Sequence, residues 1–157
     1  TETRPSVDLV VYNAGVSQIG ELRAESVSAH KRVFDINYFG AMYLLREMIE
    51  PVRKSKGTHL AMSSVAGFSP LYHRTAYAAS KHALEGLFKS LRAEELEHGV
   101  GVVVAAPSFV ATNIGNPDRK QGGIVRPGSA TDGVDYMSAE DAADLVIKCL
   151  KDTGRLG

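Results

Sequence analysis

The sequence predicts an α/β fold built on a doubly wound parallel sheet. Three short apolar runs rich in β-branched residues are separated by two long segments with helical periodicity. Each run leads into a turn that contains glycine or proline, which is typical of buried parallel strands. Because strands that alternate with long helices form βαβ units, we expect one sheet layered between helices.

The first half of the chain predicts two strands and one long helix. Val7–Tyr12 is the first apolar run, and Asn13-Ala14-Gly15 supplies the turn that ends it. Apolar residues recur three and four positions apart over about residues 28–54, so this segment is expected to be helical. A second strand is predicted at Thr58–Ser64.

The second half predicts two helices, one strand and one long loop. Helical periodicity extends over about residues 75–98, and Val100–Ala106 is the third apolar run. Residues 113–137 are rich in Gly and Pro and show no period, so a loop that acts as a lid or binding loop is expected. A last helix is predicted at about 139–150, with Ser138 as its N-cap.

Composition and charge exclude several classes of function. With 157 residues, 44% hydrophobic and 23% charged, residues 1–157 fit one globular domain. The 18 basic residues balance the 18 acidic ones, so charge gives no support for a nucleic-acid or membrane-surface partner. No apolar run approaches the length of a membrane span, and no signal peptide is recognisable. A cytoplasmic location is expected if no anchor precedes residue 1.

Several polar residues are expected to have ordinary structural roles. Cys149 lies in an apolar helical run and is expected to be a buried thiol, and a single cysteine fits a reducing compartment. Glu94, Glu95 and Glu97 are expected to form a solvated helix face. Four histidines show no spacing typical of a metal site and are expected at the surface or in loops: His59, His73, His82 and His98.

The three predicted strand ends are expected to form a ligand-binding crevice, because ligands bind outside the carboxyl ends of parallel strands. Residues 13–15, 63–67 and 107–112 are all rich in small or hydroxyl-bearing side chains, which let a flat ligand approach the backbone. Tyr77 and Lys81 lie four residues apart on the following helix, so their side chains share one face. A neighbouring positive charge lowers the pKa of a tyrosine, which favours acid–base chemistry.

Four motifs in order resemble those of the short-chain dehydrogenase/reductase family. They are Asn-Ala-Gly at 13–15, Asn37, Ser64 in Ser-Ser-x-x-Gly, and Tyr77-x-x-x-Lys81. The 27 residues from Asn37 to Ser64 and the 13 from Ser64 to Tyr77 are also similar to the family's spacings. The resemblance implies a Rossmann-like three-layer αβα fold. It also implies an NAD(P)-dependent enzyme that interconverts a carbonyl and a secondary alcohol by hydride transfer.

The resemblance further implies a role for each site residue. Tyr77 would exchange a proton with the substrate oxygen, and Ser64 would donate a hydrogen bond to that oxygen. Lys81 would bind the nicotinamide ribose and keep the pKa of Tyr77 low, and Asn37 would interrupt its helix and hold a water that links Lys81 to solvent. Besides Tyr77 and Lys81, the residues that would border the cofactor are Asn13, Ala14, Gly15, Pro107, Val110 and Thr112.

Three features depart from the family pattern. Tyr12 stands where the family often has a first Asn, and it is expected to reshape the adenosine side of the site. Ser108 replaces the usual Gly after Pro107. The family's Gly-rich cofactor loop should precede Asn13, where this chain has only twelve residues, and a final strand should follow Gly157. We therefore expect the C-terminal part of such a domain, without the loop that cradles the cofactor phosphates.

Some implications of the resemblance are narrower or remain open. Residues 37–40 and 72–77 are similar to the branch that holds 11β-hydroxysteroid dehydrogenases, which implies a hydrophobic ketone or alcohol and a preference for NADP. Tyr72 and Phe109 fit a substrate pocket and ordinary packing equally well. The family's pairing through long helices implies a homodimer or homotetramer. The alternatives are a non-catalytic nicotinamide-binding or scaffold protein and an inactive fragment of an enzyme.

Overall fold

The computed structural model describes residues 6–110, 136–152 and 154. Along the chain the elements are β1 (Leu9–Tyr12), α1 (Val27–Phe34), the π-helical turn η1 (Asp35–Phe39), α2 (Gly40–Ser55), β2 (Thr58–Met62), the 3₁₀ turn η2 (Val65–Gly67), α3 (Thr75–Glu95), the 3₁₀ turn η3 (Leu96–His98), β3 (Gly101–Ala105) and α4 (Ala139–Asp152).

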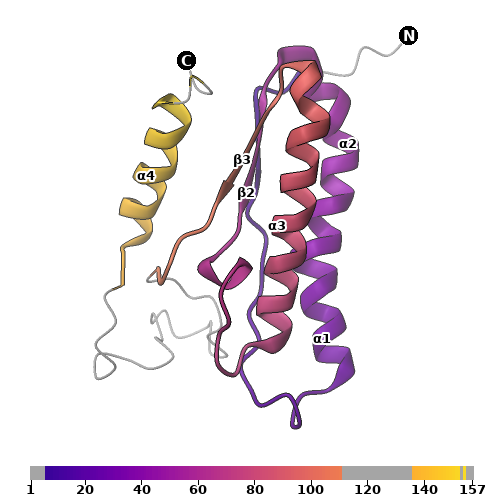
Figure 1. Cartoon of the computed structure of the whole chain (residues 1–157), viewed down its shortest axis with the longest axis vertical. Helices are drawn as coiled ribbons and strands as arrows, with labels where there is room; N and C mark the ends of the chain where they lie inside the picture. Colours follow the sequence, from indigo (N-terminus) through magenta and orange to yellow (C-terminus); the bar gives the residue numbers. More distant parts are fainter. Residues whose placement is uncertain (1–5, 111–135, 153, 155–157) are drawn as a thin grey trace.

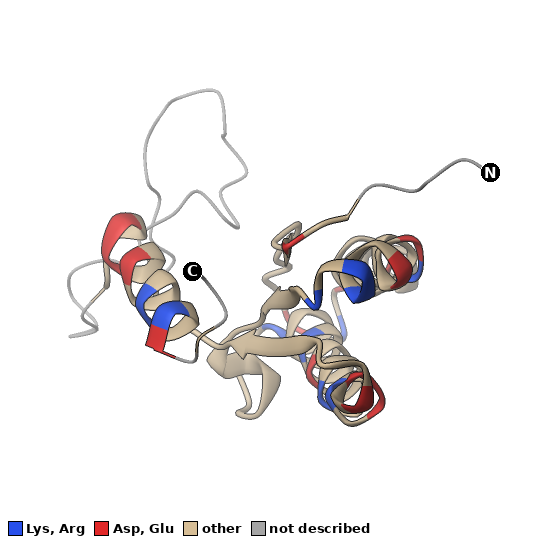
Figure 2. Cartoon of the chain, turned by 90° about the horizontal axis from the view of Figure 1, so that it is seen from above, with Lys and Arg blue, Asp and Glu red and all other residues tan. Residues whose placement is uncertain are grey.

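The sheet separates two layers of helices. Its three described strands are parallel in the order β1-β2-β3, with Thr58 aligned with Leu9 on one side and Gly101 on the other. Helices α2 and α3 lie on one face of the sheet and α4 lies on the other (Figures 1 and 2). This arrangement confirms the predicted α/β fold with a parallel sheet and helices on both faces.

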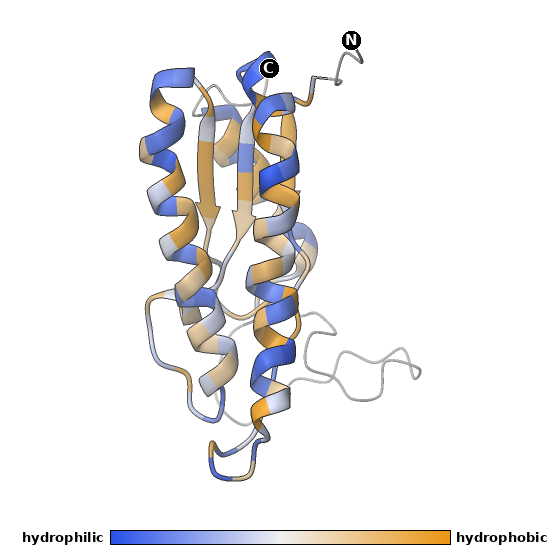
Figure 3. Ribbon diagram, turned by 90° about the vertical axis from the view of Figure 1, so that its right-hand side faces the viewer, coloured by the Kyte–Doolittle hydropathy of each residue, from blue (hydrophilic) through white to orange (hydrophobic). Residues whose placement is uncertain are grey.

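The main core lies between the sheet and the pair α2 and α3. The strands are largely apolar, whereas the helices in front of them carry polar residues on their outer sides (Figure 3). The buried core residues are Val10, Tyr12, Leu45, Val52, Ala61, Leu84, Phe88, Leu91, Val100 and Val102. Burying one large apolar side chain stabilises a fold by about 1.5–3 kcal/mol, so this layer holds α3 firmly against the strands.

The predicted helix over residues 28–54 is present but contains a π-helical turn. Segments α1, η1 and α2 follow one another without a break, and the backbone N–H of Gly40 donates to the carbonyl of Asp35 across the turn. This five-residue spacing is that of a π-helix, and such turns often occur at functional sites. The turn contains Asn37, which agrees with the implied interruption of the helix at that residue.

The structure corrects three expectations about polar residues. His59 is fully buried in β2 rather than at the surface, because its side chain points to the face of the sheet that α2 and α3 cover. Glu95 is buried instead of solvated, because α3 turns it toward α2, where Arg53 donates from Nε at 3.1 Å and from Nη2 at 2.7 Å. Cys149 is exposed rather than buried. Among the described residues of α4, Leu150 is the one that is buried.

The predicted start of α4 is confirmed, whereas the helix predicted over residues 75–98 ends as α3 at Glu95 and continues as the 3₁₀ turn η3 to His98. Gly99 follows η3 with φ of 70°, the left-handed conformation that favours glycine after a helix. At α4, the Ser138 hydroxyl accepts a hydrogen bond from the backbone N–H of Asp141 at 2.9 Å and donates to its carboxylate at 2.7 Å. Residues 113–135 of the predicted loop lie outside the described residues. None of the described helices is long and apolar enough to cross a membrane.

Candidate active site

One cleft of about 780 Å³ collects the predicted site residues at the carboxyl ends of the strands. Its walls come from the chain segments that follow the three strands, from the first turns of α3 and from the start of α4. Its lining residues are Asn13, Gly15, Met62, Ser63, Ser64, Tyr77, Lys81, Pro107, Ser108, Val110, Ala139, Ala142 and Ala143. The three strand ends therefore converge as the sequence predicts.

Tyr77 lies in the first turn of α3 and is buried against the cleft. Burial raises the pKa of its phenol, although hydrogen bonding to Ser64 and the positive charge of Arg74 both act to lower it. The net shift is upward, whereas the sequence predicts a decrease caused by Lys81. In this structure the cation that acts on the Tyr77 phenol is Arg74.

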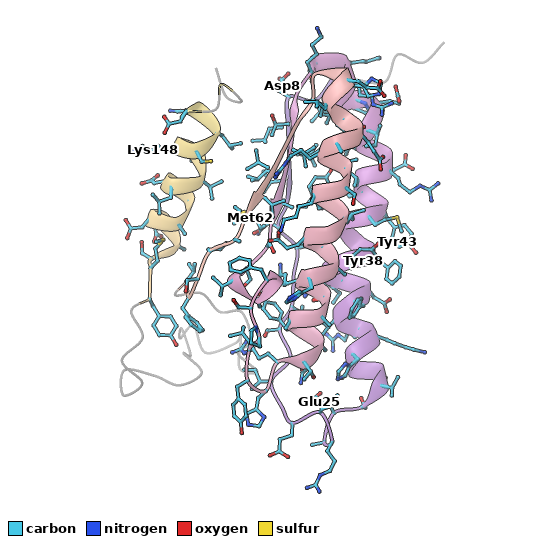
Figure 4. The ribbon with its side chains drawn as sticks, in the orientation of Figure 1. Asp8, Glu25, Tyr38, Tyr43, Met62 and Lys148 are labelled. Carbon is cyan, nitrogen blue, oxygen red and sulfur yellow. The ribbon has the colours of Figure 1, made fainter. Side chains whose placement is uncertain are left out.

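Lys81 is buried one helical turn beyond Tyr77. Its Nζ donates a hydrogen bond of 2.8 Å to the carbonyl of Met62 at the end of β2, and Met62 is labelled in Figure 4. Nζ also lies 5.8 Å from the ring centroid of Tyr77. Burial lowers the pKa of Lys81 to about 8, and the charge of Glu85 opposes that shift. The ammonium is thus held at the cleft by a strand-end carbonyl.

Ser64 is held at the cleft by the turn that follows β2. It is the N-cap of η2 and has extended backbone, with φ of −167° and ψ of 162°. Its Oγ accepts a hydrogen bond of 3.2 Å from the backbone N–H of Ala66. A serine suits this position because its hydroxyl can satisfy an unpaired N–H at the start of a helical turn. The same hydroxyl interacts with the phenol of Tyr77.

Asn37 is not part of the cleft wall but is buried behind it. Its Oδ1 accepts from the backbone N–H of Val16 at 2.8 Å, and its Nδ2 donates to the Val16 carbonyl at 3.0 Å. Nδ2 also donates to the Ser80 hydroxyl at 3.0 Å. The side chain therefore ties the loop after β1 to the π-helical turn and to α3.

The remaining predicted residues divide between the cleft and other places. Asn13, Gly15, Pro107 and Val110 line the cleft, whereas Ala14 is exposed outside the lining set. Thr112 lies outside the described residues.

Tyr12 does not have the place that the sequence predicts for it. Its ring is buried in the core against Phe88, with 4.9 Å between ring centroids, and its hydroxyl meets His59 Nδ1 at 2.7 Å. Strand alternation turns Tyr12 toward the helices, so it lies outside the set of residues that line the cleft.

Two charged residues near the cleft are not predicted from the sequence as site residues. Arg74 is the N-cap residue of α3, and its Nη1 donates to the Ser17 hydroxyl at 2.5 Å. Glu85 is buried on α3 one turn beyond Lys81. Their spacing from the Tyr77-x-x-x-Lys81 motif is the sequence signal that could have identified them. Arg74 precedes Tyr77 by three residues and Glu85 follows Lys81 by four, and residues at these spacings are neighbours on a helix.

Comparison with known proteins shows the family to which this sequence is similar. Residues 1–123 match the family model described as short chain dehydrogenase. The chain is 39% identical over 109 residues to Dehydrogenase/reductase SDR family member 7B of Bos taurus, covering 69% of this chain and 34% of that protein. It is 33% identical over 133 residues to Retinol dehydrogenase 8 of Bos taurus, covering 83% of this chain and 43% of that protein. The chain thus spans less than half the length of these curated relatives.

Solved structures show the same fold. A 4-hydroxyisoleucine dehydrogenase mutant complexed with NADH and succinate aligns with a TM-score of 0.77 at 25% identity, covering 97% of this chain and 64% of the other. An alcohol dehydrogenase from the archaeon Thermococcus sibiricus, complexed with 5-hydroxy-NADP, aligns with a TM-score of 0.76 at 21% identity. That alignment covers 93% of this chain and 57% of the other.

Proposed function

This chain belongs to the short-chain dehydrogenase family, and from that premise we propose that its protein is an NAD(P)-dependent oxidoreductase. The reaction is the interconversion of a carbonyl and a secondary alcohol. The observation that carries the proposal is the convergence of Ser64, Tyr77 and Lys81 in one cleft at the ends of three parallel strands. This is the place where open α/β sheets bind their ligands.

The proposed proton chemistry uses the described side chains. Tyr77 gives its phenolic proton to the substrate oxygen during carbonyl reduction and takes it back during alcohol oxidation. Ser64 hydrogen-bonds the same oxygen and holds the carbonyl in place. Arg74 and the Ser64 hydroxyl favour the phenolate that forms when the proton leaves, while Lys81 Nζ lies 5.8 Å from the centre of the Tyr77 ring. Asn37 supports this set by fixing the loop at Val16, and it is proposed to hold a water on the path to Lys81.

A nicotinamide cofactor fits the chemistry of the cleft. Small residues such as Gly15, Ser108 and Ala142 leave space for a flat ring between the strand ends and α4. When bound, the cofactor supplies or accepts the hydride. Lys81 would bind its ribose hydroxyls, and the residues that would border it are Asn13, Ala14, Gly15, Pro107, Val110 and Thr112.

The proposed substrate is a hydrophobic ketone or alcohol. A second cavity of about 650 Å³ adjoins the cleft and is lined mainly by apolar side chains, among them Phe109, Met137 and Leu145. The two cavities share Pro107 and Val110, so an apolar substrate tail has a place beside the proton-handling groups. The likeness to Retinol dehydrogenase 8 supports the same substrate class.

We also propose that the protein forms a homodimer or homotetramer through its long helices. Several large apolar side chains on α1, η1 and α2 are exposed, namely Val27, Phe39, Tyr43 and Leu44. Tyr43 projects from α2 away from the sheet (Figure 4). Exposed aromatic and aliphatic side chains on one pair of helices are typical of a subunit interface.

The activity test uses the protein that contains this chain, with NADPH and NADH, on ketones that include steroids and other lipids. Tyr77→Phe removes the acidic hydroxyl and keeps the ring, so we expect turnover to fall by about 10²–10⁴-fold. Tyr43→Phe makes the same change at an exposed position and should leave turnover unchanged. Turnover near the wild-type rate in Tyr77→Phe would overturn the role of Tyr77. Cofactor binding without turnover on any substrate would favour a non-catalytic nicotinamide-binding protein.

A further inference from the structure

A buried carboxylate lies directly behind the candidate active site and has no part in the chemistry described above. Glu85 follows Lys81 by four residues and Tyr77 by eight on α3, so the three side chains share one face of the helix. Only 5% of the Glu85 surface is exposed. A glutamate is seldom buried to this extent unless it is paired with a charge or a hydrogen-bond donor.

Each oxygen of the Glu85 carboxylate has a different environment. Oε2 forms an ion pair of 2.8 Å with Nζ of Lys89, one turn further along α3, where 57% of the lysine side chain is exposed. Oε1 is buried, and so is the hydroxyl of Ser63. Neither atom has a hydrogen-bond partner among the described residues. The carboxylate thus has one oxygen on a surface cation and one directed inward.

The two inward atoms, Glu85 Oε1 and Ser63 Oγ, meet beneath η2. A Cβ atom at Gly67 would lie 2.7 Å from Ser63 Oγ and 3.1 Å from Glu85 Oε1, so both atoms crowd the same point. Ser63 directly precedes Ser64, and its backbone N–H is fixed to the Ala105 carbonyl at 2.7 Å. Glu85 therefore lies against the strand end that carries the proposed substrate-binding hydroxyl.

The charges around this position favour an ionised Glu85. Burial raises the pKa of its carboxyl, but the ion pair with Lys89, the nearby Ser63 hydroxyl and the charge of Arg92 outweigh burial, so the pKa lies below its usual value. Burial lowers the pKa of Lys81 to about 8, and the negative charge of Glu85 is what opposes that decrease. Among the described residues, the Tyr77 ring also faces Lys81, with 5.8 Å between Nζ and the ring centroid.

We propose that Glu85 is a positioning residue that keeps Lys81 in its charged form and braces the Ser63–Ser64 strand end. The inference rests on the proposed oxidoreductase function for its catalytic meaning. Its physical content is independent of that function, since it concerns the charge of one buried lysine. Lys81 is 4% exposed, and a nearby negative charge stabilises a buried ammonium. Glu85 lies one helical turn away from it on the same face of α3.

The direct test follows the titration of Lys81 by NMR in protein that contains isotope-labelled lysine. The Lys81 signal is assigned by its loss in Lys81→Arg. Glu85→Gln keeps the shape of the side chain and removes its charge, so the pKa of Lys81 should fall by about one unit. Glu85→Asp keeps the charge and should restore most of the shift. Glu94→Gln makes the same charge change at an exposed position of α3 and should leave Lys81 unchanged.

The titration of Lys81 tests the role of Glu85, and the activity tests the proposed function, so either proposal can be refuted without the other. If the proposed function holds, Glu85→Gln should move the alkaline limb of the pH–activity profile down by the same amount as the Lys81 titration. An unchanged Lys81 pKa in folded Glu85→Gln would overturn the positioning role, whatever the activity. A shifted Lys81 pKa in a protein inactive on every substrate would uphold the positioning role and count against the proposed function instead.

Discussion

At the scale of single residues, a buried imidazole makes the core sensitive to acid. His59 is fully buried, and its Nδ1 forms a hydrogen bond of 2.7 Å with the Tyr12 hydroxyl, so the other ring nitrogen is Nε2. That Nε2 is buried without a partner among the described residues. Burial lowers the pKa of His59 to about 4, although the charge of Glu95 opposes the shift, so His59 is neutral in the folded protein near neutral pH.

This depressed pKa predicts a loss of stability as the pH falls. The unfolded chain protonates His59 near its ordinary pKa of about 6.5, whereas the folded chain protonates it only near pH 4. Between these values the unfolded state binds more protons, so the free energy of unfolding decreases with falling pH, by about 3 kcal/mol in total. His59→Asn keeps an acceptor for Tyr12 without titrating, and it should remove this part of the slope.

The measurement is the free energy of unfolding in urea, at about pH 7 and about pH 5, for the wild type, His59→Asn and a control variant. His82→Asn serves as the matched control, because His82 is exposed on α3 and its replacement should leave the slope as it is in the wild type. Parallel pH dependence in His59→Asn and the wild type would contradict the assignment.

At the scale of elements, the short turn η2 connects the end of β2 to the site face of α3. Gly67 ends this turn, and it is packed so closely against α3 that a Cβ would lie 2.7 Å from Glu85 Cγ. The glycine of the Ser-Ser-x-x-Gly motif is therefore required by close approach. Its absence of a side chain lets the serine turn lie directly on the helix that carries Tyr77 and Lys81.

Replacing this glycine should affect stability and the site together. Gly67→Ala forces Ser63 or Glu85 to move, and overpacking of this kind costs about 1–3 kcal/mol. Gly86→Ala is the matched control, since a Cβ at Gly86 meets nothing within 4 Å and alanine favours the helix by up to about 1 kcal/mol. Thermal unfolding should place the two variants on opposite sides of the wild type. A Gly67→Ala protein as stable as Gly86→Ala would show that Ser63 and Glu85 can move aside without a loss of stability.

At the scale of the whole molecule, the layered architecture determines where function and assembly lie. The site forms where the carboxyl ends of three strands meet the start of α3 and the start of α4. The exposed apolar side chains of α1 and α2 do not line the cleft, and Tyr43 projects from the outer side of α2 (Figure 4). Subunit contacts on that surface would leave the cleft open to ligands.

This separation predicts that assembly can be disrupted without loss of the fold. Tyr43 is 61% exposed on α2, and Tyr43→Glu places a charge in the proposed interface. We expect sedimentation velocity to show a shift from dimer or tetramer to monomer. Tyr72→Glu changes a residue that is 86% exposed on a loop away from α2, and it should leave the assembly intact. A wild-type protein that sediments as a monomer would refute the proposed oligomer.

The sequence by itself determined the elements and the composition of the cleft. Apolar periodicity reports which face of a strand or helix is buried, so the strands, the long helices and their order were predictable. Parallel strands must end on one edge of the sheet, so the meeting of Asn13, Ser64 and Pro107 was predictable as well. Tyr77 and Lys81 followed from helical spacing. The roles of these residues rest on the family resemblance and remain proposals.

Only the tertiary structure decided how the buried polar groups are paired. Arg53 meets Glu95 across two helices, and Tyr12 meets His59 across two strands, although 42 and 47 residues separate the partners in the chain. Local periodicity carries no information on such distant pairs, and so the burial of His59 and Glu95 was not predicted. The upward shift of the Tyr77 pKa was not predicted for the same reason, because desolvation depends on everything packed around the phenol.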